Sequence, residues 1–132
     1  MFQLVYASRP FGFDAAVLIA ILFEARKYNA AHDITGALLV RNDLYIQLLE
    51  GAEPDVRALY ARIARDDRHA HVTVLGERHV QRRMFADWAM KDDPLPTNIW
   101  PPDDTERMLA APDPGAAFAV FTRLAAGRLQ QV

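Results

Sequence analysis

The chain has 132 residues, with 15 Lys or Arg and 17 Asp or Glu, so its formal net charge is −2. Because one domain commonly takes about 100–200 residues, this length allows a single compact domain with a short appendage and excludes a two-domain enzyme. The absence of cysteine excludes disulfides, thiol nucleophiles, cysteine-bound zinc and iron–sulfur clusters, and it fits a reducing compartment.

The hydropathy and charge patterns bear on whether the protein crosses a membrane, is secreted or binds nucleic acid. The longest uninterrupted apolar run, residues 15–23, is far shorter than the ~20 residues of a membrane span, and the first residues lack the basic region of a signal peptide. We therefore expect a cytoplasmic protein without a membrane partner. Arginines gather in residues 57–83, but no interleaved aromatic residues accompany them, which favours a solvated surface over a nucleic-acid interface.

The first half of the chain predicts a strand, a helix and a hairpin. Residues 2–8 are β-rich and end at a break in residues 9–12, which is typical of a strand followed by a loop. Asp14 is the candidate cap of a helix that continues to about Asn29, with apolar residues at helical spacing. A turn over residues 32–36 precedes two strands, residues 37–40 and 44–50, joined by a tight turn.

The next segment predicts a second helix and two more strands. Pro54 suits the first turn of a helix, and Val56, Leu59 and Ile63 form its apolar stripe, which ends before Arg68. Residues 71–79 predict a strand, and residues 84–90 a short fifth one. The order β-α-β-β-α-β-β is that of a ferredoxin-like α+β fold, with two helices on one face of a mainly antiparallel sheet.

The C-terminal part has a different composition. We expect a main domain over residues 1–91, a linker rich in Pro and Asp over residues 92–104, and a helical appendage over residues 105–132. Within the appendage, residues 105–111 and 115–129 show helical patterns. Since the strand at residues 44–50 is apolar on both faces, either these helices or a second subunit of a homo-oligomer should cover the sheet face opposite the main helices.

Two polar residues occupy inward positions of predicted strands. Tyr6 lies between Leu4 and Ser8 on one face of the first strand, and Gln47 interrupts an apolar face of the third. If these strands are neighbours, the two side chains can touch. A Tyr–Gln hydrogen bond in an ordinary core is the simplest interpretation of this pair alone.

The two predicted helices add polar groups on the same side. Asn29 continues the inward stripe of the first helix, although asparagine also commonly ends helices, and Arg62 and Asp66 are spaced as a surface ion pair would be. Trp88 and Met90 lie two residues apart and are expected in the core, on one face of the last strand. Together with Tyr6 and Gln47, these groups predict an apolar cleft with convergent hydrogen bonds, which suits a flat imide-bearing heterocycle such as isoalloxazine.

At this point the sequence resembles the BLUF family, which senses blue light with FAD. The matching stretches are residues 4–8 (LVYAS), 25–29 (ARKYN), 34–39 (ITGALL), 47–51 (QLLEG), 62–69 and 85–90, so the resemblance covers about residues 2–91. It implies non-covalently bound FAD as the cofactor, and we expect no metal site.

The resemblance implies a role for each matching residue. Tyr6 matches the tyrosine that donates an electron and a proton to the photoexcited flavin, and Gln47 matches the glutamine that bridges this tyrosine and the flavin N5/O4 edge. Asn29, Arg62 and Asp66 match the residues that bind the pyrimidine side of the ring.

The last matching stretch carries the residues that are implied to change as the signal forms. Trp88 and Met90 match the residues whose environment or hydrogen bonding changes, and Ser8 matches a residue near that tryptophan. Tyr28 stands where relatives often have His or Asn, so no contact from it to the cofactor is implied. Without cysteine, a cysteinyl–flavin adduct is impossible, which leaves a hydrogen-bond rearrangement around Tyr6 and Gln47.

Two other functions share this order of elements. An acylphosphatase-type enzyme would use Arg9 and Asn42, but residues 9–12 lack the run of backbone donors that a phosphate cradle needs. A small regulatory domain would bind a ligand without photochemistry. We expect a photoreceptor rather than an enzyme, and one that acts on a separate signalling protein through its C-terminal helices or the sheet face that they cover.

Overall fold

The computed structural model describes residues 1–10, 15–66 and 69–129. In chain order its elements are β1 (Phe2–Pro10), α1 (Ala15–Ala31), β2 (Thr35–Arg41), β3 (Leu44–Gly51), α2 (Glu53–Ala64), β4 (His69–His79), β5 (Lys91–Pro94), α3 (Pro102–Ala110) and α4 (Pro114–Ala125). The predicted β-α-β-β-α-β-β order, followed by two helices, is confirmed. The candidate cap Asp14 and the predicted helix limit Arg68 lie outside the described residues.

Local sequence explains where two of the helices begin. Pro54 lies in the first turn of α2 between Glu53 and Asp55, whose negative charges favour a helix N-terminus. Pro114 likewise opens α4, where the Asp113 side chain caps the helix by accepting a hydrogen bond of 3.2 Å from the Ala116 N–H. Proline therefore opens both helices, with acidic charges in the first turn of α2 and a side-chain cap at the start of α4.

The sheet has the strand order β4-β1-β3-β2-β5. β1 pairs antiparallel with both β3 and β4, β2 pairs antiparallel with β3, and only the β2–β5 pair is parallel among the pairs of this sheet. In the β1–β3 register Tyr6 lies directly opposite Gln47. The expectation that the first and third strands are neighbours is confirmed.

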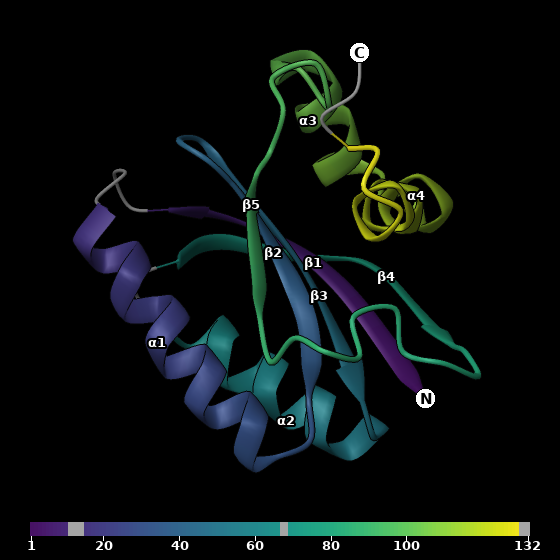
Figure 1. Ribbon diagram of the computed structural model, residues 1–132. Helices are drawn as coiled ribbons and strands as arrows, with labels where there is room; N and C mark the ends of the chain where they lie inside the picture. The colour runs from purple at the N-terminus through teal and green to yellow at the C-terminus, as the bar shows by residue number, and fades with distance from the viewer. Residues whose placement is uncertain (11–14, 67–68, 130–132) are drawn as a thin grey trace.

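Helices cover both faces of the sheet, with α1 and α2 on one side and α3 and α4 on the other (Figure 1). Side chains alternate between the faces along each strand, so β1 contributes Leu4 and Tyr6 to the core beneath α1 and α2, and Val5 and Ala7 to the core beneath α4. The C-terminal helices thus cover the second face, as one of the two sequence-based alternatives predicted.

The position of the fifth strand differs from the prediction. Residues 84–90 are not a strand; the backbone N–H groups of Met84 and Phe85 instead donate to the Glu50 carboxylate, at 2.7 Å each. The strand lies at Lys91–Pro94, across the predicted boundary between the main domain and the linker, where residues of low β propensity form the edge next to β2. Trp88 and Met90 consequently do not share a strand face.

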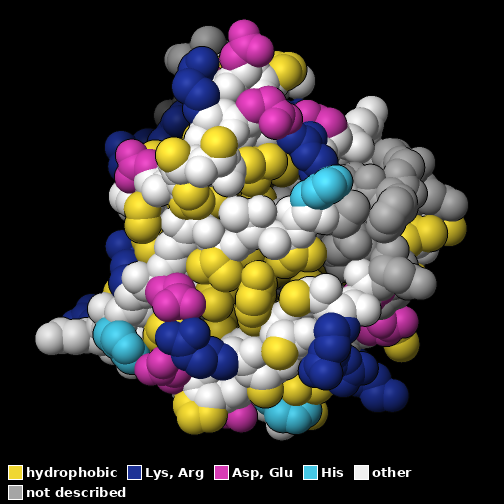
Figure 2. Space-filling model, turned by 180° about the vertical axis from the view of Figure 1, so that it is seen from behind, with side chains coloured by type: hydrophobic (Ala, Val, Ile, Leu, Met, Phe, Trp, Pro, Cys, Tyr) yellow, Lys and Arg dark blue, Asp and Glu magenta, His cyan; other side chains and the backbone are white. Residues whose placement is uncertain are grey.

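Basic and acidic side chains alternate on the surface. Arg57, in the arginine-rich segment, forms ion pairs with both Glu53 and Glu77. In the rear view, dark blue and magenta groups lie next to each other around a central area of hydrophobic side chains (Figure 2). Within the described ranges, no helix combines the length and hydropathy needed to cross a membrane.

Candidate functional site

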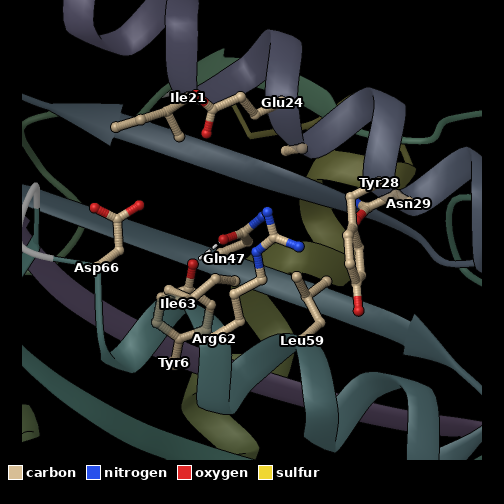
Figure 3. Close-up of a pocket in the computed structure, with 11 residues that line it drawn as sticks. Tyr6, Ile21, Glu24, Tyr28, Asn29, Gln47, Leu59, Arg62, Ile63 and Asp66 are labelled. Carbon is tan, nitrogen blue, oxygen red and sulfur yellow. Dashed lines mark hydrogen bonds between the residues drawn. The ribbon is translucent and has the colours of Figure 1, made fainter.

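A cleft lies between the helices α1 and α2 and the strands β1 and β3, and it has about 640 Å³ of space, part of it open to solvent. Its lining residues are Tyr6, Ile21, Glu24, Ala25, Tyr28, Asn29, Gln47, Leu59, Arg62, Ile63 and Asp66 (Figure 3). All five residues that the sequence assigned to cofactor binding lie in this one cleft.

A chain of three side chains runs from the cleft into the core: Tyr6 and Gln47 line the cleft, and Met90 lies behind Gln47. The Tyr6 hydroxyl donates a hydrogen bond to Gln47 Oε1, and Gln47 Nε2 donates to Met90 Sδ at 3.3 Å (Figure 3 shows the first of these bonds). All three residues are buried. The carboxamide therefore has a defined orientation, with its acceptor end toward the phenol and its donor end toward the thioether.

The Tyr6 phenol is held in its protonated form. Burial raises the pKa of Tyr6 well above its usual range, and the neighbouring Tyr60 and Asp66 act in the same direction. The Tyr60 ring meets the Tyr6 ring edge-on, with 5.7 Å between centroids. Tyr6 consequently keeps a proton available for donation to Gln47.

Asn29 presents an acceptor without a partner. Its Nδ2 donates to the backbone oxygen of Ala89 at 2.8 Å, but its buried Oδ1 has no hydrogen-bond partner among the described residues. An unsatisfied buried acceptor costs roughly 1–3 kcal/mol. Its location in the cleft fits a ligand that brings an N–H group, as the imide edge of a flavin does.

Aromatic and charged side chains form the mouth of the cleft. The Arg62 guanidinium lies 4.8 Å from the centre of the Tyr28 ring. The Tyr28 ring also stacks on the His32 ring, with 3.9 Å between their centroids. Sequence reasoning left Tyr28 out of the site. The signal was present, because Ile21, Ala25 and Tyr28 follow helical spacing on one side of α1.

Three of the predicted photoactive residues lie outside the cleft lining. Met90 reaches the site only through Gln47, and Ser8 is buried in β1 opposite Tyr45. Trp88 was expected in the core but is 49% exposed, with Lys91 Nζ 4.7 Å from its ring centre. The core prediction for Trp88 is wrong because the strand that should have turned its ring inward does not form.

Arg9, one of the two residues nominated for the acylphosphatase alternative, is engaged with other parts of the protein. Arg9 pairs with Glu106 of α3 and donates to the backbone oxygen of Asp43 at 3.4 Å. Its guanidinium therefore joins the sheet to a C-terminal helix. The described part of the chain also holds no cluster of three or more His, Asp or Glu that could bind a metal ion.

The comparison with protein families decides between these alternatives. The family model for sensors of blue light using FAD, the BLUF family, matches residues 1–91, which include every residue of the cleft. The chain belongs to the BLUF family. The cofactor of this family is FAD.

A curated relative and two solved structures agree with this assignment. Photoactivated adenylate cyclase subunit beta of Euglena gracilis is 40% identical over 74 residues, a match that covers 55% of this chain and only 9% of the relative. The dark-state structure of BlrB, a BLUF protein, is 26% identical and superposes with a TM-score of 0.78 over 96% of each chain. A bacterial light-regulated adenylyl cyclase is 33% identical with a TM-score of 0.68, over 83% of this chain and 34% of that one.

Proposed function

We propose that this BLUF protein converts blue light into a rearrangement of the hydrogen bonds of Tyr6 and Gln47. The observation that carries the proposal is the buried chain from the Tyr6 hydroxyl through the Gln47 carboxamide to Met90 Sδ. Bound FAD supplies the absorption of blue light and an excited state that accepts an electron. Asn29, Arg62 and Asp66 would hold the pyrimidine side of the ring, with Asn29 Oδ1 accepting its N–H.

The two ends of the Gln47 side chain make the rearrangement possible. Tyr6 holds its proton at the hydroxyl, against Gln47 Oε1, so the phenol has a direct route for proton transfer. Rotation or tautomerisation of the carboxamide changes which of its ends donates. After rotation, Gln47 Oε1 would face Met90 Sδ, and two acceptors cannot form a hydrogen bond. The change at Gln47 thereby reaches Met90.

Met90 connects this change to the rest of the molecule. It directly precedes β5, and the linker and C-terminal helices follow β5. We infer that residues 1–91 are the sensor and that residues 92–104 and 105–132 carry the output, with Trp88 and Ser8 responding near the start of this route. The relatives named above include light-regulated cyclases. For this chain we propose a separate signalling protein as the partner and a homo-oligomeric form.

The photochemical proposal is tested by absorption spectroscopy of the protein reconstituted with FAD. We expect a yellow protein whose flavin absorption shifts slightly to the red under blue light and returns in the dark. Tyr6→Phe and Gln47→Leu should each retain flavin and lose the shift. Tyr60→Phe removes the hydroxyl of the adjacent ring and should keep the shift, because phenylalanine preserves the edge-on ring contact and the Tyr6–Gln47 hydrogen bond does not involve Tyr60.

Two results would reject this proposal. One is a protein that stays colourless after reconstitution, and the other is an unchanged photocycle in both Tyr6→Phe and Gln47→Leu. The partner proposal needs its own test, a pull-down with the full chain in light and in darkness from the cells that produce it. Identical captured proteins in both conditions would contradict light-dependent binding.

A further inference from the structure

The segment between β4 and β5 connects the two cores of the molecule. β4 and β5 are the opposite edges of the sheet, so the chain between them must cross one end of the sheet (Figure 1). Phe85 is buried in the core beneath α4, where its ring meets Phe121 edge-on at 6.4 Å. Met90 is buried in the other core, beside Gln47. A displacement at Met90 therefore has a route along the backbone to Phe85 and from there, through the ring contact, to α4.

Glu50 fixes the Phe85 end of this segment. Its side chain is fully buried, and each carboxylate oxygen accepts two hydrogen bonds. Oε1 accepts from Met84 N at 2.7 Å and Gln3 Nε2 at 3.0 Å, while Oε2 accepts from Phe85 N at 2.7 Å and Thr35 Oγ1 at 2.9 Å. These contacts tie the segment to β3 and also to β1 and β2.

A nearby cation completes this arrangement. Arg83 donates to Thr35 Oγ1 at 2.9 Å, to the backbone oxygen of Glu50 at 3.2 Å and to that of Asp33 at 2.8 Å. A buried carboxylate is tolerated when donors and an opposite charge compensate for its lost hydration. Glu50 is therefore an anchor with hydrogen bonds to both of its side-chain oxygens.

We propose that Glu50 is a positioning residue of the light response, which holds Phe85 on β3 so that the change at Met90 moves α4 instead of loosening the segment. β3 carries both attachment points, Gln47 on the cleft side and Glu50 on the α4 side. With the Phe85 end held by Glu50, the residues between the two points connect Gln47 in the cleft to the ring contact between Phe85 and Phe121. This inference rests on the proposed photochemical function.

Glu50→Gln tests the anchor with almost no change of shape. A carboxamide has one acceptor end, so its NH2 group faces the N–H of Met84 in one orientation and that of Phe85 in the other. In either case one backbone donor loses its acceptor. From the usual cost of such a loss, we expect the amides of Met84 and Phe85 to exchange with solvent roughly tenfold faster.

The experiment measures hydrogen exchange of the full FAD-loaded chain in darkness and in blue light. In Glu50→Gln, the red shift of the flavin should persist, whereas the light-minus-dark difference in exchange over residues 114–125 should fall to less than half. The matched control is Ile46→Val, a fully buried change on the same face of β3. Ile46→Val should lower stability but keep the light-minus-dark difference in exchange over residues 114–125. Should Glu50→Gln not fold, Thr35→Val removes one donor to Oε2 and should act in the same direction more weakly.

The outcomes separate this proposal from the photochemical one. If Glu50→Gln keeps both the red shift and the full light-minus-dark difference in exchange over α4, the role of Glu50 is overturned and the photochemical proposal stands. The same holds if Ile46→Val loses as much of this difference as Glu50→Gln does. If the unmodified protein shows no red shift, the photochemical function fails. The anchoring role of Glu50 is then still testable. It is overturned if the Met84 and Phe85 amides of Glu50→Gln exchange in darkness at the same rate as in the unmodified protein.

Discussion

Individual polar atoms, buried among apolar side chains, give the cleft its chemistry. The hydroxyl of Tyr6 and the carboxamide of Gln47 satisfy each other, while Oδ1 of Asn29 has no partner among the described residues. The cleft thus holds its proposed switch in a defined orientation and reserves one acceptor for a ligand. This division gives each of these residues a different expected phenotype.

Replacing Asn29 should weaken cofactor binding and not the switch itself. Asn29→Leu removes the free acceptor, and we expect the affinity for FAD to fall about tenfold, in line with one neutral hydrogen bond and the desolvation of its partner. Titration of the apoprotein followed by flavin fluorescence measures this. The control Asn42→Leu alters an exposed turn asparagine outside the cleft and should bind FAD normally. Equal affinities in the two variants would contradict the role of Asn29 Oδ1.

The raised pKa of Tyr6 predicts a specific loss of stability in alkali. Burial raises this pKa above the ordinary value of 10.0, so the folded protein keeps a proton that the unfolded chain releases above that pH. The stabilisation is complete below pH 10.0 and declines as the pH rises, by up to about 1.4 kcal/mol per pH unit. Urea unfolding of the apoprotein on both sides of this pH should show a steeper decline than in Tyr6→Phe. Parallel curves would show that Tyr6 titrates normally.

Residue spacing was sufficient to predict that these polar residues lie in one cleft. Tyr6 and Gln47 lie at alternating strand positions, and Asn29 and Arg62 lie on helical stripes, so local periodicity brings them together once the strand order is known. Trp88 was misplaced because the buried end of its segment is held by Glu50, more than thirty positions earlier in the chain. No local pattern encodes a contact of that kind.

At the level of secondary-structure elements, the connection between β5 and α3 is more ordered than its composition indicated. Proline and aspartate predicted a linker, yet the side chain of Arg41, at the end of β2, donates to the backbone oxygens of Ile99 and Trp100 at 2.9 Å each. The Thr105 hydroxyl donates to the same oxygen of Trp100 at 2.6 Å. Hydrogen bonds from a strand and a helix therefore order this connection, and composition alone does not show them.

Removing Arg41 should release this connection. Arg41→Met keeps much of the aliphatic length but leaves the carbonyl groups of Ile99 and Trp100 without this donor, so we expect a loss of about 1–3 kcal/mol in stability. Limited proteolysis should cut residues 95–101 sooner than in the unmodified protein, with the flavin spectrum unchanged. Arg107→Met is the matched control, since this exposed arginine pairs only with exposed Asp104 among the contacts described on α3. Equal cleavage of both variants would show that the Arg41 hydrogen bonds do not order this connection.

For the molecule as a whole, the two helical layers have different roles. α1 and α2 enclose the cleft, whereas α4 buries the apolar side of β1 and β3, including Val5, Ile46 and Leu48. Because α4 covers this face, the sheet becomes accessible to a partner from this side only if α4 moves. We expect this cover to link the output of the sensor to its state of assembly.

A chain that ends at Pro101 should reveal this link. Loss of α3 and α4 would expose the apolar face of the sheet, and large exposed apolar patches promote association. We expect dimers or larger species in size-exclusion chromatography with light scattering, whereas FAD should still bind, because no residue of the cleft is removed. Phe121→Ala in the full chain is the companion variant, since it removes a fully buried ring from the same interface without exposing the whole face. It should lower stability by about 3–5 kcal/mol and leave the chain's association unchanged. If the shortened chain remains in the association state of the full chain, the C-terminal helices are not what keeps this face from pairing, and the output must then depend on their outer surfaces alone.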